Sequence, residues 1–357
     1  MTKNILARPK ALRTALVLSL VLVLIVWISS LIFINNFYQE YFPRFDKEAY
    51  SGRLEFGDVP EYSPTMVKFP SGENMLTGYI FGEENSKGLV VLATGIGEGT
   101  EHYLAEMMYF VDHGWRVFTF EYTGSYASEG ENSVGLPQSR LDLEAALAYI
   151  QGNDTLSHLP LVLWGHSWGG YAVAAVLKEH PDIAAVATLS SFNSPRDFMN
   201  ERIRNEVGIW AYFEYPLTWA YQTVRFGRNA DVTAVDGINS TDTPVMIIHG
   251  SADDAVAYDG ASIIAQREKI TNPNVVYKTC STKDHNGHRN LLWSEAAVQY
   301  MEQKNQEYRD LLDRYDGDIP KDVKADFYAG VDRFRTSEVD VDLMNEINSF
   351  FEGALLD

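Results

Sequence analysis

Cysteine is almost absent from this sequence: Cys280 is the one cysteine among 357 residues. No intramolecular disulfide can therefore form, and a zinc site built from several thiolates is excluded. Cys280 ends an apolar, strand-like stretch over residues 275–280. No electropositive setting is evident around it, so we expect a buried core residue rather than a catalytic thiol.

Basic residues are also scarce, with 29 Lys and Arg against 49 Asp and Glu, a formal net charge of −20 and a pI of about 4.8. Such a surface repels nucleic acid and anionic lipid headgroups, which argues against a DNA- or RNA-binding role. Hydrophobic residues make up 46% of the chain, enough for a substantial core. The length fits one large α/β domain or two small ones.

Charge, glycine and proline are all missing from residues 15–34. A helix of that length spans about 30 Å, the thickness of a bilayer's hydrocarbon core. Four basic residues and no acidic ones precede it: Lys3, Arg8, Lys10 and Arg13. The positive-inside tendency therefore predicts a cytoplasmic segment over residues 1–14 and an extracytoplasmic domain at the cell surface.

The alternative to this transmembrane signal-anchor is a cleaved signal peptide. The apolar run is longer than the usual h-region of about 7–15 residues, and no clear small-x-small site follows it, so we favour the anchor. Residues 35–60 are expected to form a stalk. Its first aromatic residues are expected to form an interfacial belt: Phe37, Tyr38, Tyr41 and Phe42.

Residues 61–357 alternate between apolar, β-rich runs and helical stretches. Strands that are apolar on both faces and alternate with helices predict a mostly parallel sheet with helices on both sides. A hairpin over residues 65–81 predicts an antiparallel edge. Residues 193–242 are rich in aromatic residues and predict a small helical cap, whose rings we expect mainly to pack the cap onto the sheet. Residues 302–341 predict a charged helical insertion before a last amphipathic helix.

Gly165-His166-Ser167-Trp168-Gly169 lies between an apolar strand and a small-residue helix. This G-x-S-x-G motif, in that context, predicts a sharp strand-to-helix turn that exposes the Ser167 hydroxyl above the sheet. The two glycines leave room for neighbouring backbone. The helix N-terminus then offers free N–H groups to a developing oxyanion.

A nucleophilic serine needs a base, and the base needs a carboxylate that orients it. In chain order, the strand at residues 245–249 is followed by Asp253 and Asp254, and the strand at 275–280 by His285 and His288. Each candidate therefore follows the end of a strand. The pattern alone does not choose between Asp253 and Asp254, or between His285 and His288.

Four motifs between about residues 62 and 301 resemble the α/β-hydrolase superfamily, in its esterase, monoacylglycerol-lipase and serine-aminopeptidase-like branch. They are the loop at residues 93–97, the loop at 121–130, the elbow at Ser167, and H-G-x-x-D-x-x-V at 249–256 with the later Gly287-His288 pair. The resemblance implies a triad of Ser167, Asp253 and His288.

The same resemblance implies an oxyanion hole made by the backbone N–H groups of Ile96 and Trp168. Thr94 stands where the family usually has His, so Gly97 is an alternative donor to Ile96. The resemblance also implies that no cofactor is needed.

Three other interpretations each fit only part of the sequence. Gly95-Ile96-Gly97-Glu98-Gly99-Thr100, with Glu121 after the next strand, is similar to a dinucleotide fingerprint but lacks its third glycine. Asp284, His285 and His288 could be drawn as a metal site, but no ligand spacing supports it, and we predict no metal. A hydrolase fold kept as a non-catalytic surface binding module usually lacks a triad member, whereas all three are present here.

We therefore predict a serine hydrolase that cleaves a carboxylic ester through an acyl-enzyme, with a small-molecule or lipid ester as substrate. The aromatic-rich cap and the membrane tether fit an apolar acyl group. The alternative is a serine peptidase, because Ser167-Trp168-Gly169-Gly170-Tyr171 resembles the elbow of prolyl-oligopeptidase-like enzymes.

Overall fold

The strands form one mixed sheet in this computed structural model, which describes residues 8–356. Within that part of the chain, eight strands pair in the order β1-β2-β4-β3-β5-β6-β7-β8. β1 and β2 form a hairpin, β2 pairs antiparallel with β4, and the pairings from β4 to β8 are parallel. The expected α/β-hydrolase architecture is confirmed. The strands are β1 (Thr65–Ser71), β2 (Asn74–Phe81), β3 (Leu89–Ala93), β4 (Arg116–Phe120), β5 (Leu161–His166), β6 (Ala185–Leu189), β7 (Val245–Gly250) and β8 (Val275–Cys280).

Helices cover both faces of the sheet, because successive residues of a strand point to opposite sides and both sets are apolar. Val91 of β3 enters one core, whereas its neighbours Val90 and Leu92 enter the other. The helices of the first core are α3 (Gln138–Gln151), α4 (Trp168–Ala175) and α7 (Ala234–Asn239), and those of the second are α2 (Leu104–Asp112) and α11 (Val341–Ala354).

Short 3-10 segments occur between the strands and helices. Cys280, expected in the core, is only partly buried because β8 is an edge strand. The 3-10 segments are η1 (Phe56–Asp58), η2 (Pro60–Tyr62), η3 (Thr100–Tyr103), η4 (Val176–Lys178), η5 (Gly208–Trp210), η6 (Gly227–Asp231), η7 (Ile264–Lys269) and η8 (Asn290–Leu292).

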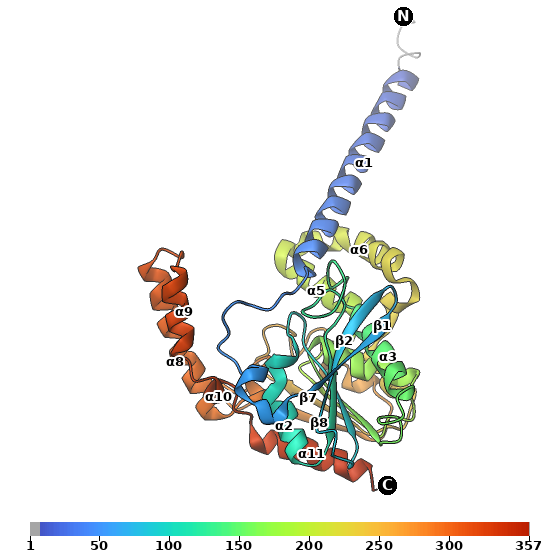
Figure 1. The fold of residues 1–357 in the computed structure, drawn as a ribbon. Helices are drawn as coiled ribbons and strands as arrows, with labels where there is room; N and C mark the ends of the chain where they lie inside the picture. Colours follow the sequence, from blue (N-terminus) through green and yellow to red (C-terminus); the bar gives the residue numbers. More distant parts are fainter. Residues whose placement is uncertain (1–7, 357) are drawn as a thin grey trace, which may run out of the picture.

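The N-terminal helix α1 (Arg8–Tyr41) projects from the domain and is longer than the predicted span (Figure 1). Among the described helices, the stretch Leu12–Tyr41 alone is long and apolar enough to cross a membrane. Residues 1–7 of the predicted basic segment lie outside the described residues. The aromatic belt is corrected in part, because Tyr38 and Phe42 are buried against the domain, with exposed fractions of 2% and 1%.

The chain after α1 is docked on the domain, which differs from the expected stalk. Phe45 forms a short parallel bridge with Ser125, in the loop after β4. The guanidinium of Arg44 donates hydrogen bonds to three carbonyl oxygens of the same loop, those of Tyr126, Ser128 and Gly130. The segment that leaves α1 is therefore held against the loop that follows β4.

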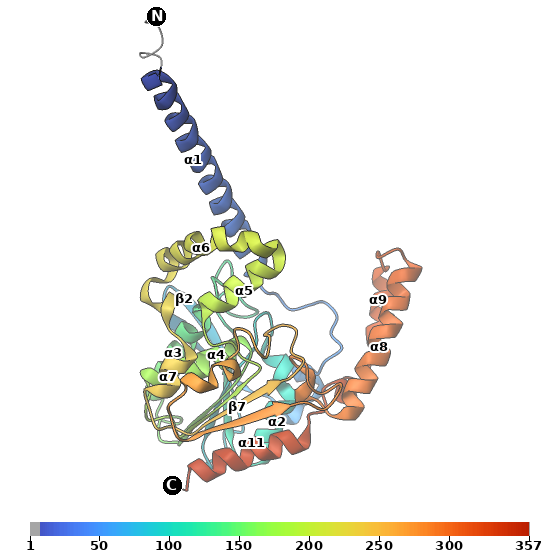
Figure 2. The same cartoon turned by 180° about the vertical axis from the view of Figure 1, so that it is seen from behind.

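The cap consists of α5 (Pro195–Val207) and α6 (Ala211–Phe226), which lies across the base of α1 in both views (Figures 1 and 2). The predicted cap was too long, because α7 packs on α4 and belongs to the helices over the sheet. The aromatic residues at the junction of η5 and α6 also differ from expectation. Trp210, Tyr212 and Phe213 are exposed rather than packed onto the sheet.

The predicted insertion forms an arm that stands off the domain (Figure 2). Its first helix, α8 (Glu295–Arg314), begins seven residues before the expected boundary at 302, and α9 (Lys321–Ala329) packs back along it through aromatic contacts of Tyr308 with Phe327. The short helix α10 (Arg333–Thr336) leads to α11.

Candidate active site

Ser167 stands at a strained turn between β5 and α4. Its backbone has φ 55° and ψ −112°, a conformation that a non-glycine residue adopts only when its surroundings enforce it. Two glycines allow the turn. A Cβ on Gly165 would lie 2.5 Å from the Gly169 carbonyl oxygen, and one on Gly169 would lie 2.1 Å from the carbonyl oxygen of Ala93.

The three side chains predicted as a triad form a continuous hydrogen-bonded chain. His288 Nε2 lies 2.9 Å from Ser167 Oγ. The other ring nitrogen, Nδ1, lies 2.8 Å from Asp253 Oδ2 and 3.0 Å from Oδ1. Ser167 follows β5, Asp253 follows β7 and His288 follows β8, so the sheet brings together residues far apart in the sequence.

Asp253 is held by donors on each oxygen. The backbone N–H groups of Ala255 and Val256 both donate to Oδ1, at 2.9 and 2.8 Å. Oδ2 also lies 3.2 Å from Nε2 of His249. Burial raises the pKa of Asp253, but the hydrogen bonds of His249 and His288 together outweigh it and hold that pKa below its usual value. Asp253 is therefore ionised at neutral pH.

The two residues that competed for these roles lie elsewhere. Asp254 is exposed in the loop after β7. His285 lies in the loop before His288 and is half-buried. Burial lowers the pKa of His288, and the Asp253 carboxylate, which raises that pKa, offsets this effect only in part. The imidazole of His288 is therefore neutral at pH 7.

The cavity beside Ser167 has a volume of about 200 Å³. Both residues expected at the oxyanion hole, Ile96 and Trp168, line it. Trp168 is the first residue of α4, so its N–H is free of the helix ladder. Gly97, the alternative donor, faces the Phe45 ring and does not line this cavity. The apolar wall of the cavity comes from Tyr41, Ile96, Leu136, Phe192, Phe198 and Val256.

A buried hydrogen-bond network, which the sequence analysis missed, holds the backbone of His288. His166 Nε2 lies 3.0 Å from the His288 carbonyl oxygen, and its Nδ1 lies 2.8 Å from the Tyr103 hydroxyl. Tyr103 in turn contacts Glu98, which pairs with Arg289. Burial lowers the pKa of His166. The sequence signal that pointed to His166 was its position in the G-x-S-x-G motif, directly before Ser167.

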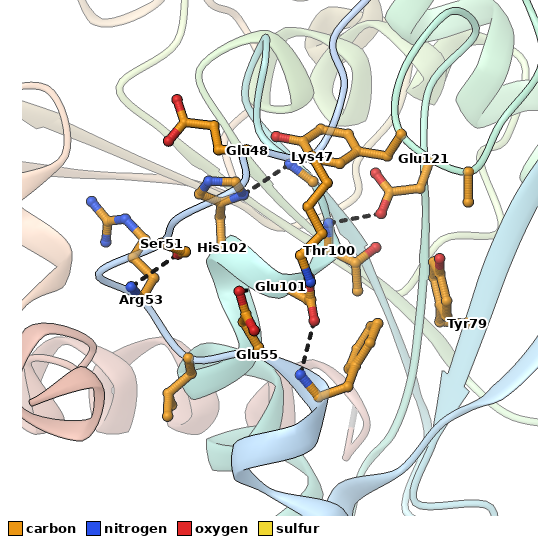
Figure 3. A pocket seen from close by; sticks show the side chains of 15 residues that line it. Lys47, Glu48, Ser51, Arg53, Glu55, Tyr79, Thr100, Glu101, His102 and Glu121 are labelled. Atoms are coloured by element: carbon orange, nitrogen blue, oxygen red, sulfur yellow. Dashed lines mark hydrogen bonds and ion pairs between the residues drawn. The ribbon is translucent and has the colours of Figure 1, made fainter. Parts of the chain in front are cut away.

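A second cavity, of about 380 Å³, is lined by residues 99–102 and by residues of the segment over 47–56 (Figure 3). None of the three triad side chains lines it. At its edge Glu121 accepts a hydrogen bond from the Thr100 N–H at 3.0 Å, and burial raises the pKa of Glu121 to about 7. Glu121 thus ties two loops together, which accounts for the carboxylate that the dinucleotide interpretation had invoked.

Among residues 8–356, no group of three or more His, Cys, Asp or Glu side chains is placed to hold a metal ion. In the cluster once considered for a metal, His288 directs its two nitrogens to Ser167 and Asp253. Asp284 is exposed.

Comparisons with known proteins agree with this fold. The model of the prolyl oligopeptidase family matches residues 105–313. The quorum-quenching protein AidA of Acinetobacter baumannii is 27% identical over 141 residues, 38% of this chain and 46% of its own. The chain thus matches less than half the length of that relative. The Pyrococcus furiosus esterase Pf2001 superposes with a TM-score of 0.52 at 17% identity, over 76% of this chain and 98% of its own.

Proposed function

The chain belongs to the prolyl oligopeptidase family and is a serine hydrolase, and from this premise we propose that it cleaves carboxylic esters through Ser167, His288 and Asp253. The observation that carries the proposal is the chain of hydrogen bonds from Ser167 Oγ through both nitrogens of His288 to Asp253. Acyl transfer needs a nucleophile, a base and an orienting carboxylate in this order.

In the first half of the reaction, neutral His288 takes the proton of Ser167 Oγ through Nε2 while the oxygen attacks the substrate carbonyl. Asp253 holds the Nδ1–H tautomer and stabilises the imidazolium that forms. The N–H groups of Ile96 and Trp168 receive the oxyanion. Each such donor is typically worth on the order of 10²–10³ in turnover.

The tetrahedral intermediate then collapses, its C–O bond to the alcohol breaks, and the imidazolium of His288 protonates the departing alkoxide, which completes the first half. In the second half, the neutral ring activates a water molecule. That water attacks the acyl-enzyme carbonyl and releases the acid, and Ser167 regains its proton. Every step uses side chains and amides of this chain, so the mechanism needs no cofactor.

An ester with an apolar acyl group is the substrate class that the cavity favours. Its wall is formed largely by aliphatic and aromatic side chains, and the carboxylate that lines it, Glu98, is already paired with Arg289. A peptide substrate would need polar partners for its backbone N–H and C=O groups. Family membership keeps peptide cleavage as the second candidate.

We also propose that α1 is an uncleaved signal-anchor, with the N-terminus in the cytoplasm and the domain outside. The exposed apolar side chains of α1 support this, as do the four basic residues that precede its uncharged run. Protease treatment of intact cells tests the orientation: the domain should be degraded, whereas a domain on the cytoplasmic side should survive.

A fluorophosphonate probe tests the proposed nucleophile. The full chain in detergent should be labelled on Ser167, and Ser167→Ala and His288→Ala should abolish the label. His285→Ala is the matched control and should label normally. Labelling that persists in His288→Ala, or a label on another residue, would contradict the proposed triad.

A substrate panel separates the two candidate functions. We expect p-nitrophenyl esters of short and medium acyl chains to be cleaved, and aminoacyl or N-acyl-peptide anilides to be cleaved far more slowly. Faster cleavage of the anilides would favour a peptidase and overturn the ester proposal while leaving the triad intact.

A further inference from the structure

The cap carries an apolar face that no described part of the chain covers. We define this cap face as Ile209, Trp210, Tyr212 and Phe213, on η5 and the start of α6. Their exposed fractions run from 63% for Tyr212 to 76% for Ile209. Large aromatic side chains gathered in one exposed patch mark a contact site with a partner or a membrane.

The cap face lies beside the uncharged run of α1. Ser30 Oγ donates a hydrogen bond to Glu214 Oε1 at 2.9 Å, from within that run to the first turn of α6. Further along α1, the Gln222 side chain donates to the Tyr38 hydroxyl at 2.6 Å. These contacts fix α6 against α1, so the position of the anchor in a bilayer also sets the position of the cap.

The depth of that position follows from helix geometry. Ser30 lies four residues before Ile34, the end of the uncharged run, which is about 6 Å along a helix. α6 crosses α1 obliquely and contacts it again at Tyr38, eight residues after Ser30, through Gln222, eight residues after Glu214 (Figures 1 and 2). With α1 along the membrane normal, the end of α6 that carries the cap face lies near Ser30, at the depth of about 5–10 Å that interfacial helices occupy, and the Gln222 end lies outside the uncharged run.

The charge of the cap also suits this location. Residues 195–231 contain five arginines and five acidic residues and are neutral overall, in a chain whose formal net charge is −20. The rest of the domain is repelled by anionic headgroups, whereas the cap is not. Trp and Tyr are the side chains that prefer the interfacial layer.

The cavity of Ser167 is bounded by the same two elements. Tyr41, the last residue of α1, lines its wall together with Phe198 of the cap helix α5. We propose that the cap face lies in the interfacial layer of the bilayer that holds α1, and that Ser167 acts on acyl esters drawn from this layer. The second part rests on the proposed ester hydrolysis, and the first part does not.

Depth-dependent quenching tests the location of the cap face. The full chain with Cys280→Ser is the background, so that each variant has one cysteine. Phe213→Cys places that cysteine on the cap face, and Phe334→Cys on α10 is the control. Each variant is labelled with an environment-sensitive dye and placed in lipid vesicles. Phe334 is exposed, at 57%, and lies away from α6 (Figure 1). We expect lipid-borne quenchers to quench the dye at 213 and not at 334.

Two results would overturn this location. A dye at 213 that is reached by aqueous quenchers alone would leave the cap in solvent. A dye at 213 that is shielded from lipid and water quenchers alike, and that self-quenches between labelled molecules, would assign the cap face to a second copy of this chain.

Kinetics test the use of membrane esters. Trp210→Ser with Phe213→Ser should lower hydrolysis of a fluorogenic ester embedded in vesicles by roughly tenfold, as expected when two aromatic groups leave the lipid. Hydrolysis of soluble p-nitrophenyl butyrate should stay within about twofold, as should both activities of the control Phe334→Ser. Equal losses on both esters would refute access from the membrane. Activity that persists in Ser167→Ala would instead refute the proposed nucleophile and leave the quenching result standing.

Discussion

Replacement of Asp253 by asparagine tests the proposed triad most directly, because backbone N–H groups bond to only one of its two carboxylate oxygens. Oδ1 accepts the N–H groups of Ala255 and Val256, and Oδ2 is the nearer oxygen to His288 Nδ1, at 2.8 Å. In Asp253→Asn the two amide donors keep the side-chain oxygen at the Oδ1 position, since an NH₂ group there would face two N–H groups. The NH₂ group must then face His288 Nδ1.

This arrangement reverses the tautomer of His288. The NH₂ group donates to Nδ1, so the ring proton moves to Nε2, the atom 2.9 Å from Ser167 Oγ. A protonated Nε2 cannot accept the serine proton. In a serine protease, the corresponding change costs on the order of 10⁴ in kcat. We expect a similar loss here, about 5.5 kcal/mol in the barrier, with KM little changed.

The assay is steady-state hydrolysis of p-nitrophenyl butyrate by the full chain in detergent. Asp254→Asn is the matched control, because Asp254 is the exposed neighbour in the same loop, and it should stay within about twofold of the parent. Circular dichroism and Tm must match between the two variants. If Asp253→Asn folds normally and keeps more than about a tenth of the parent kcat, Asp253 does not orient His288 and the reasoning fails.

Three further outcomes are expected. Burial lowers the pKa of His288 from its usual value of 6.5, and its neutral form is the base, so kcat/KM should fall in acid as the ring is protonated and level off toward neutral pH. A profile that rises only above pH 8 would contradict this. Gly169→Ala places a Cβ 2.1 Å from the carbonyl oxygen of Ala93 and should lower the free energy of unfolding by about 3 kcal/mol or more in urea titration, whereas Gly57→Ala, with nothing within 4 Å, should change it by less than about 1 kcal/mol. Because Ser167 has φ 55°, Ser167→Gly should be more stable than Ser167→Ala by about 1 kcal/mol by calorimetry, and equal stabilities would mean that the turn is unstrained.

Most of the candidate site could be predicted from the sequence because each member of the predicted triad follows the end of a parallel strand. A parallel sheet brings those ends to one edge, so Ser167 could be expected to meet a carboxylate and a histidine from the two later loops. The pattern left Asp254 and His285 open as well, and the resemblance to the α/β-hydrolases selected Asp253 and His288. His166 and Tyr103 could not be found in this way. Their role depends on which buried hydroxyl lies within reach of which ring nitrogen, and no periodicity encodes that.

The cap was predicted less well, for a physical reason. An amphipathic pattern indicates that one helix face is apolar but does not say what covers it. The aromatic residues of residues 193–242 were assigned to packing on the sheet, whereas Trp210 and Phe213 are exposed. α7 was assigned to the cap because it follows α6 closely, yet its small and aliphatic residues pack on α4.

The prediction of a stalk was wrong because composition does not reveal whether a segment packs against the domain. Residues after the uncharged run look like a polar connector, but Tyr38 bonds a cap residue 184 positions away, and Arg44 and Phe45 bind the loop after β4. A flexible stalk would let the domain rotate freely over a membrane. This one fixes the domain instead, since the same segment contacts the cap, the β4 loop and, through Tyr41, the cavity of Ser167. The approach of a substrate to Ser167 is therefore set by the orientation of α1, and a change that loosens Arg44 should alter the use of membrane-embedded esters more than that of soluble ones.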